Sequence, residues 1–175
     1  SEGRHFHGNF DHFTNYYATG QVDASKGRFN SLREICNNST SKPLNTVGYP
    51  FISLDKSFEI RDLKHTANFD FEKPIYSKDE ILISDSINEL LAGNLKKSLK
   101  NAGVQSKGPT WYSFSNIDGS LNSNNCVLGS STQTQGIIGH FGSSDNNWIK
   151  STLTSMHKSN GCNNWADLLC ISEKK

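Results

Sequence analysis

Residues 74–93, PIYSKDEILISDSINELLAG, contain the clearest local structural signals in the chain. Pro74 restricts the backbone at an edge position, and the apolar residues that follow it predict a β-strand. A helix is then predicted up to Gly93, with Ser84 or Asp85 as its N-cap, because the apolar residues in between recur at helical spacing. Glycine is typical of a helix C-terminus because it adopts the left-handed conformation without strain. A strand that leads into a short helix is therefore the starting point for the fold.

Other segments give shorter signals of secondary structure. The stretch RFNSLREIC, residues 28–36, has apolar residues at three- and four-residue spacing, which predicts a short amphipathic helix with Cys36 on its buried side. The remaining predicted elements are strands at 13–20, 49–55 and 168–171, a short helix or turn at 55–65, and a strand followed by a turn at 111–120.

The length and composition fit one loop-rich domain. The chain has 175 residues, of which 34% are hydrophobic, and its mean hydropathy is −0.60. Residues 115–147 are mostly Ser, Asn, Gly and Thr, which indicates long loops of the kind that carry function or are held by disulfides. Without internal repeats or a linker, the length fits a single domain. We expect this domain to span residues 16–175, with residues 1–15 as an N-terminal extension.

The charge of the chain argues against nucleic acid as a partner. The formal net charge is +1, which gives no strong field that would attract a polyanion. The tightest basic cluster is NLKKSLK, with Lys96, Lys97 and Lys100, and we interpret it as a solvated helix end, with an anion-binding patch as the alternative. No apolar window is long enough for a transmembrane segment. No signal peptide is visible, but the opening SEG is also compatible with a processed terminus.

The four cysteines, at positions 36, 126, 162 and 170, indicate an oxidising compartment. None forms a CxxC pair, so their spacing does not fit a zinc knuckle. An even number in a polar, loop-rich chain favours two disulfides over free thiols, and the spacing leaves all three pairings open. Disulfides predict a protein that is secreted, exposed on the cell surface or periplasmic.

Four segments, taken in order, resemble endostatin, the C-terminal globular module of certain basement-membrane collagens. Within residues 74–93 the resemblance is carried by a set of matching positions: Pro74, Lys78, Asp79, Glu80, Ser86, Glu89 and Gly93. The segments ATGQVDASKGRFNSLREIC (18–36), GPTWYSFSNIDGS (108–120) and CNNWADLLCIS (162–172) are similar to other parts of the family. The resemblance covers most of residues 16–172. Bacterial endostatin-like secreted proteins carry this module too, and the Asn-, Lys- and Ser-rich composition suits a bacterial member.

The resemblance implies a fold, a disulfide pairing and a function. The implied fold is α+β and C-type-lectin-like, with a twisted, mostly antiparallel sheet, two main helices, long loops and two disulfides. The implied pairs are Cys36–Cys170 and Cys126–Cys162. The implied function is that of a non-catalytic binding module in cell adhesion, with an extracellular matrix protein or a glycan as its partner.

The same resemblance implies a zinc site near the N-terminus. Family members bind zinc through a His-x-His pair, a further histidine and an aspartate, and the matching residues here are His5, His7, His12 and Asp70. Histidines two residues apart project to the same side of a strand, and imidazole and carboxylate are suitable zinc ligands. The alternative is that these side chains belong to a solvated terminus.

Three further groups of residues are candidates for ligand binding. Lys26, Arg28 and Arg33 lie on or beside one predicted helix and form a thin basic patch, since arginine suits sulfate and carboxylate groups. His140, in GIIGHF, is a candidate for a ligand-facing loop, with a backbone hydrogen bond as the alternative. Trp148 follows two asparagines, a pattern found in carbohydrate sites, and a core position is its alternative.

These observations favour a binding module over an enzyme. No G-x-S-x-G elbow occurs, and disulfides would remove every thiol nucleophile. The alternatives are a secreted hydrolase with its site in the 115–147 loops around His140, and a structural subunit of a surface assembly. No cofactor other than zinc is expected.

Overall fold

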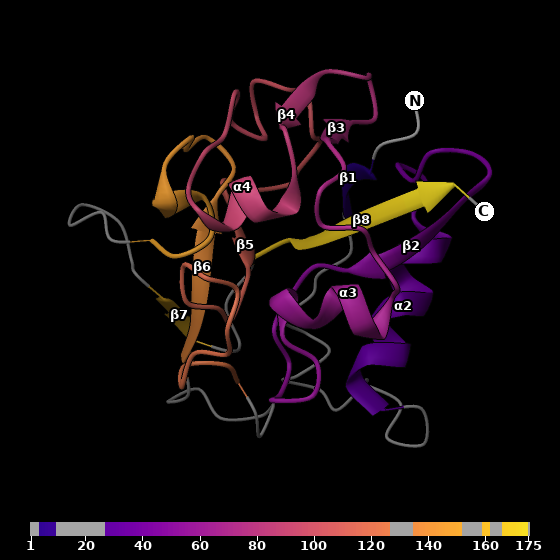
Figure 1. Cartoon of the computed structure of the whole chain (residues 1–175). Helices are drawn as coiled ribbons and strands as arrows, with labels where there is room; N and C mark the ends of the chain where they lie inside the picture. Colours follow the sequence, from indigo (N-terminus) through magenta and orange to yellow (C-terminus); the bar gives the residue numbers. More distant parts are fainter. Residues whose placement is uncertain (1–3, 10–26, 127–134, 152–158, 162–165, 175) are drawn as a thin grey trace.

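The computed structural model describes residues 4–9, 27–126, 135–151, 159–161 and 166–174. The elements of these ranges are shown in Figure 1. In chain order they are β1 (Arg4–Asn9), α2 (Gly27–Asn38), β2 (Thr46–Pro50), η1 (Ile60–Asp62), α3 (Leu63–Thr66), β3 (Ile75–Ser77), β4 (Leu82–Ser84), α4 (Ile87–Leu91), β5 (Thr110–Tyr112), β6 (Gln135–His140), η2 (Asn146–Trp148), β7 (Ser159–Gly161) and β8 (Leu168–Lys174).

The larger sheet has five strands in the order β2-β8-β1-β3-β4. Strand β8 runs antiparallel to both β1 and β2, β3 runs antiparallel to β4, and only β1 and β3 are parallel. We expected residues 1–15 to be an extension outside the domain, but residues 4–9 form the middle strand of this sheet. The reason is burial: Phe6 is 0% exposed, and its ring packs against Phe51 and Trp148.

A second sheet has three antiparallel strands in the order β5-β6-β7. An isolated parallel bridge between Trp111 and Asp167 connects it to the chain just before β8. Both sheets share the largest hydrophobic cluster, in which the rings of Trp111 and Trp148 lie 5.5 Å apart and are fully buried. The described part is therefore α+β with mostly antiparallel strands, as the resemblance implies. The described helices are too short and too polar to cross a bilayer.

Helix α2 is attached to both strands of the pair β2–β8. The predicted amphipathic helix is confirmed, with Leu32 and Cys36 fully buried. The Asn37 side chain donates to the carbonyl of Gly48 in β2 and accepts from its amide (3.0 and 2.9 Å). A disulfide joins Cys36 to Cys170 in β8 across a separation of 134 residues. Closing a loop of that length stabilises the fold by roughly 4–5 kcal/mol in the chain-entropy description.

The stretch 74–93 folds largely as predicted, with two differences. The strand after Pro74 is a hairpin, β3 and β4, whose turn includes Glu80 at a φ of 63°. The N-cap of α4 is neither Ser84 nor Asp85 but Ser86, whose hydroxyl accepts from the amide of Glu89. Ser84 is buried instead and donates to the carbonyl of Asn94. Gly93 follows the helix at a φ of 84°, as expected for its end.

Candidate functional site

A pocket lies where the start of β5 meets the end of β6. Its volume is about 540 Å3, within the range of pockets that hold small ligands. Three stretches that are far apart in the sequence line it. They are Lys100, residues 106–109 and residues 140–143.

Backbone hydrogen bonds hold these three stretches together. The amide of Lys100 donates to the carbonyl of Phe141 (2.8 Å), and the amide of Phe141 donates to the carbonyl of Pro109 (3.1 Å). The turn that carries Lys100 is anchored by Leu99 and Ala102, both fully buried in the main core. The backbone around the pocket is therefore held by hydrogen bonds and by the core.

The pocket combines positive charge with an apolar floor. Lys100 and Lys107 are exposed, and the described lining residues include no carboxylate. Ser106 and Ser143 add hydroxyl groups, and the exposed Pro109 supplies apolar surface, whereas Phe141 is buried in the main core. Two ammonium groups with hydroxyls nearby can bind an anionic group, because a charge-assisted hydrogen bond is stronger than a neutral one.

His140 lies at the end of β6 and lines this pocket. It is 4% exposed, and its Nε2 is 2.8 Å from the hydroxyl of Ser151. Burial lowers the pKa of this imidazole below its ordinary 6.5, so the ring is neutral at pH 7. The predicted ligand-facing histidine therefore lines a pocket, and its hydrogen bond goes to a side chain and not to the backbone.

Asp167 fixes one wall of the pocket from outside its lining. It is 6% exposed, and its carboxylate accepts from the amide of Lys107 (2.7 Å). Burial raises the pKa of this carboxyl from 3.8 to about 6, against the lowering effect of the hydrogen bonds from Lys107 and Gly108. Sequence reasoning missed Asp167 and Lys107, because neither lies in a recognisable motif and their contact spans 60 positions.

The four predicted zinc ligands are only partly covered by the described residues. The side chain of His5 is buried, and its Nε2 is 2.9 Å from Glu80. Asp70 is exposed and accepts from the amide of Glu72 in its own turn. The side chain of His7 and all of His12 lie outside the described residues. Among the described residues, no three metal-ligating side chains form a group, and the zinc site stays a prediction.

The two predicted basic residues of α2 are held by different partners. The guanidinium of Arg28 donates to the carbonyls of Leu54 (2.9 Å) and Asn125 (3.3 Å). The guanidinium of Arg33 lies over the ring of Tyr49, 4.8 Å from its centroid. Lys26, the third residue of the predicted patch, lies outside the described residues. Both arginines thus serve packing contacts within the domain.

Trp148 is placed in the core, so its ring is not exposed for stacking on a sugar. It is 0% exposed and packs against Phe6, Phe51 and Trp111. This is the position that the alternative interpretation gave it. The pattern of asparagines before a tryptophan marks η2, where Asp145 caps the turn by accepting from the amide of Asn147.

The implied disulfide pairing is confirmed for one of its two bridges. Cys36 and Cys170 are joined. Cys126 is also disulfide-bonded, whereas Cys162, its implied partner, lies outside the described residues. The second pair therefore stays a prediction.

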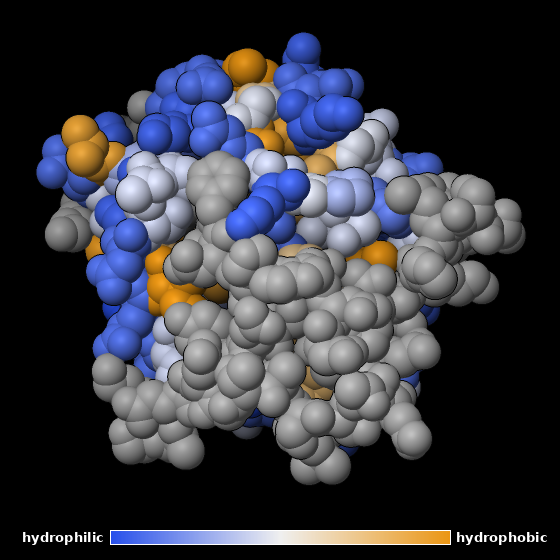
Figure 2. Space-filling view, turned by 180° about the vertical axis from the view of Figure 1, so that it is seen from behind, coloured by the Kyte–Doolittle hydropathy of each residue, from blue (hydrophilic) through white to orange (hydrophobic). Residues whose placement is uncertain are grey.

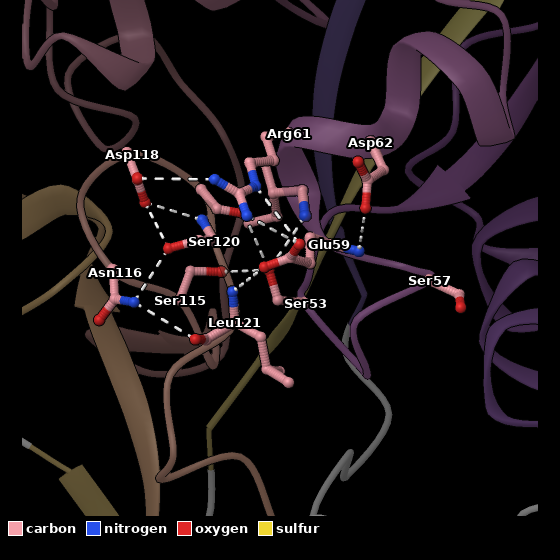
Figure 3. A network of polar contacts seen from close by, with 12 residues as sticks. Ser53, Ser57, Glu59, Arg61, Asp62, Ser115, Asn116, Asp118, Ser120 and Leu121 are labelled. Carbon is pink, nitrogen blue, oxygen red and sulfur yellow. Dashed lines mark hydrogen bonds and ion pairs between the residues drawn. The ribbon is translucent and has the colours of Figure 1, made fainter.

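A second polar region surrounds Glu59, and Figure 3 shows its contacts. Glu59 is 8% exposed, and its carboxylate accepts from Arg61 (3.1 Å) and from the amide of Leu121 (2.5 Å). Asp118 accepts from the amide and hydroxyl of Ser120 (2.9 and 2.6 Å). The bond from Leu121 to Glu59 and the bond from the amide of Arg61 to the carbonyl of Gly119 (3.2 Å) fasten the turn at 116–120 to η1. The region is therefore a structural clamp whose polar groups bind one another.

Figure 2 shows one face of the molecule coloured by hydropathy. Hydrophilic residues cover most of the described part of that face, and hydrophobic residues appear as separate spots. Among the described residues, the large hydrophobic side chains that are exposed are Leu44 (89%) and Ile117 (44%). Single exposed apolar residues are common on soluble proteins and do not define an interface.

A comparison with models of known protein families finds no match. A search of curated proteins finds none either. The endostatin resemblance therefore rests on the sequence segments described above.

Proposed function

We propose that this chain is a secreted or cell-surface binding module with an endostatin-like, C-type-lectin-like fold and no catalytic activity. Its partners are extracellular matrix proteins or glycans. The observation that carries the proposal is a preformed, positively charged pocket on a disulfide-bonded scaffold. Such an arrangement suits recognition, because a rigid support positions the binding groups in advance.

The disulfide supports the extracellular part of the proposal. Disulfides persist in oxidising compartments and are rare in the reducing cytosol. Intact mass with and without reductant tests this for protein purified without added oxidant. A gain of about 4 Da on reduction supports two native bridges. An unchanged mass would argue against an extracellular protein.

The binding part is tested with immobilised laminin, fibronectin, collagen and heparin, each with zinc and with a chelator. Saturable binding to one of them supports the proposal, and dependence on zinc would assign a role to His5 and His7. Binding that is lost in the double variant K100Q/K107Q would place the partner at the pocket. Absence of binding to every probe would favour the alternatives below.

One observation favours a hydrolase as the second candidate. The hydrogen bond between His140 and Ser151 has the form of a base beside a nucleophile. However, Ser151 is 1% exposed and does not line the pocket, and no described carboxylate contacts His140 to orient it. Turnover of an activated ester that disappears in both H140A and S151A would establish this candidate. Equal turnover in both variants and the wild type would eliminate it.

A further inference from the structure

The pocket beside His140 has three properties that together define the chemistry of its ligand. Its charged lining groups are Lys100 and Lys107, both cationic at neutral pH, and His140 is held neutral by burial. The lining also contains two serine hydroxyls, Ser106 and Ser143. All of these polar groups can donate a hydrogen bond, so the lining is complementary to an acceptor that carries negative charge.

The carboxylate of Asp167 interacts electrostatically with Lys107 but lies outside the pocket lining. Asp167 contacts the same wall, but its oxygens accept from the backbone amides of Lys107 and Gly108. It does not line the pocket. Its charge therefore reduces the positive potential of the wall without occupying the space into which a ligand would enter.

Two glycines at the rim keep that space open. A Cβ atom built on Gly108 or on Gly142 would meet nothing within 4 Å, and neither residue has a positive φ. Neither glycine is therefore required by backbone strain or by close packing. A larger side chain at Gly142 fits the backbone and adds bulk at a residue that lines the pocket.

We propose that this pocket binds a single anionic group of a ligand, a phosphate, sulfate or carboxylate, between Lys100 and Lys107. The volume of about 540 Å3 leaves room for the body of a small ligand beside the anion, with the exposed Pro109 as an apolar contact. This inference rests on the proposed binding function and names the ligand chemistry of that site.

The test is a titration of the whole chain with sodium phosphate, sodium sulfate and sodium acetate, at constant ionic strength and followed by amide chemical shifts. We expect at least one anion to shift the amides of residues 106–108 and 140–143 in a saturable way. The anion that binds most tightly identifies the group. Shifts spread evenly over all surface lysines, or no shifts with any of the three anions, would overturn the proposal.

Variants with matched charge make the test specific. K100Q/K107Q is expected to weaken binding by about tenfold or more, since each lost charge-assisted bond is worth a factor of that order. K96Q/K97Q removes the same net charge at two exposed lysines outside the pocket, and it should bind as the wild type does. Equal weakening in both double variants would show a nonspecific charge effect and overturn the proposal.

A steric variant tests the role of the pocket without changing its charge. G142L keeps every charge and adds bulk to the pocket lining, so we expect it to weaken or abolish the titration while the spectrum stays folded. Unchanged anion binding in G142L would place the anion elsewhere and overturn the assignment.

Failure of the matrix-protein panel with a positive anion titration would reject only the proposed partners, so the two proposals fail separately.

Discussion

The Glu59 network and the lysine pocket are both polar, but their charged groups lie in different surroundings. In the network, the carboxylate of Glu59 accepts from Arg61 and from a backbone amide, and Asp118 is bonded to Ser120 (Figure 3). In the pocket, Lys100 and Lys107 line open space together, without a carboxylate among the described lining residues. The first arrangement holds the chain in place, and the second leaves binding capacity for another molecule.

The difference shows that residue type alone does not separate structural from functional charge. A buried charge must be paired within the fold, because leaving it unpaired costs several kcal/mol. An exposed lysine can exchange a surface contact for a ligand at little cost, because exposed ion pairs contribute little to stability. Substitutions should therefore affect stability in the network and binding in the pocket.

The largest stability effect is expected for Glu59→Ala. This substitution leaves the amide of Leu121 and part of the Arg61 guanidinium without their acceptor, in a place where the carboxylate is 8% exposed. We expect the free energy of unfolding to fall by about 3 kcal/mol. Urea denaturation followed by tryptophan fluorescence, with the disulfides intact, measures it.

Glu72→Ala is the matched control for this experiment. Glu72 is exposed, and its carboxylate accepts from the side-chain amide of Asn88, so its loss should cost about 0.5 kcal/mol. If both glutamates had equal effects on the free energy of unfolding, the network would not be a clamp.

The next largest effect concerns Asp167 and depends on pH. Burial raises the pKa of its carboxyl to about 6 in the folded protein, so between pH 4 and 6 the folded state holds this proton more tightly than the unfolded state does. The contribution to the free energy of unfolding therefore falls as pH rises through this window, by about 2 kcal/mol. Above this window the contribution of Asp167 no longer changes with pH.

Asp167→Asn removes this titration and supplies the comparison. The difference in unfolding free energy between the wild type and the variant should shift by about 2 kcal/mol from pH 4 to pH 7.5, with the wild type losing relative stability at the higher pH. His140 has a lowered pKa and gives a pH dependence of the opposite sign, but it is present in both proteins and cancels. A difference that is constant with pH would mean that Asp167 is not desolvated in solution.

Local patterns predicted the elements of the chain better than their arrangement. The spacing of apolar residues was enough for α2, and glycine chemistry was enough for the end of α4 at Gly93. The central position of β1 was not predictable, because its partners lie about seventy and more than one hundred and sixty positions away. The N-cap of α4 was predicted one or two positions too early. Ser84, Asp85 and Ser86 all carry side chains that can cap a helix, and only the fold shows that Ser84 is buried and bonded to Asn94 while Ser86 caps the helix.

The candidate site shows the same limit. Sequence proximity grouped Lys100 with Lys96 and Lys97, whereas the fold brings Lys100 to Lys107 and His140 through its contact with Phe141. His140 itself was identified from its glycine-rich surroundings. Its neighbours in the pocket could not be, because they depend on hydrogen bonds between segments forty residues apart.

A smaller effect is expected for Asp118→Asn at the rim of the network. The pKa of Asp118 lies below its ordinary 3.8, mainly because the hydroxyl and amide of Ser120 bond to the ionised form, with Arg61 as a lesser cause. The side chain is largely exposed, so solvent screens these interactions, and the loss should be below about 1 kcal/mol at pH 7. Its contribution is present above the unfolded pKa and is lost as pH falls through the folded pKa, so wild type and variant should converge below pH 3. A gap that persists at pH 2.5 would point to lost packing instead of lost charge.

The smallest effect on stability is expected where the effect on binding is largest. K100Q/K107Q should change the free energy of unfolding by less than about 0.5 kcal/mol, because both side chains are exposed and the backbone bonds of Lys100 and Lys107 are kept. Urea denaturation of the double variant, beside K96Q/K97Q, checks this at pH 7.5. Lys107 also lies near the Asp167 carboxylate, so any loss that does occur should be absent at pH 4, where that carboxyl is protonated. A loss of stability comparable with that of Glu59→Ala would mean that these lysines are part of the scaffold, and the contrast between a paired network and an open pocket would fail.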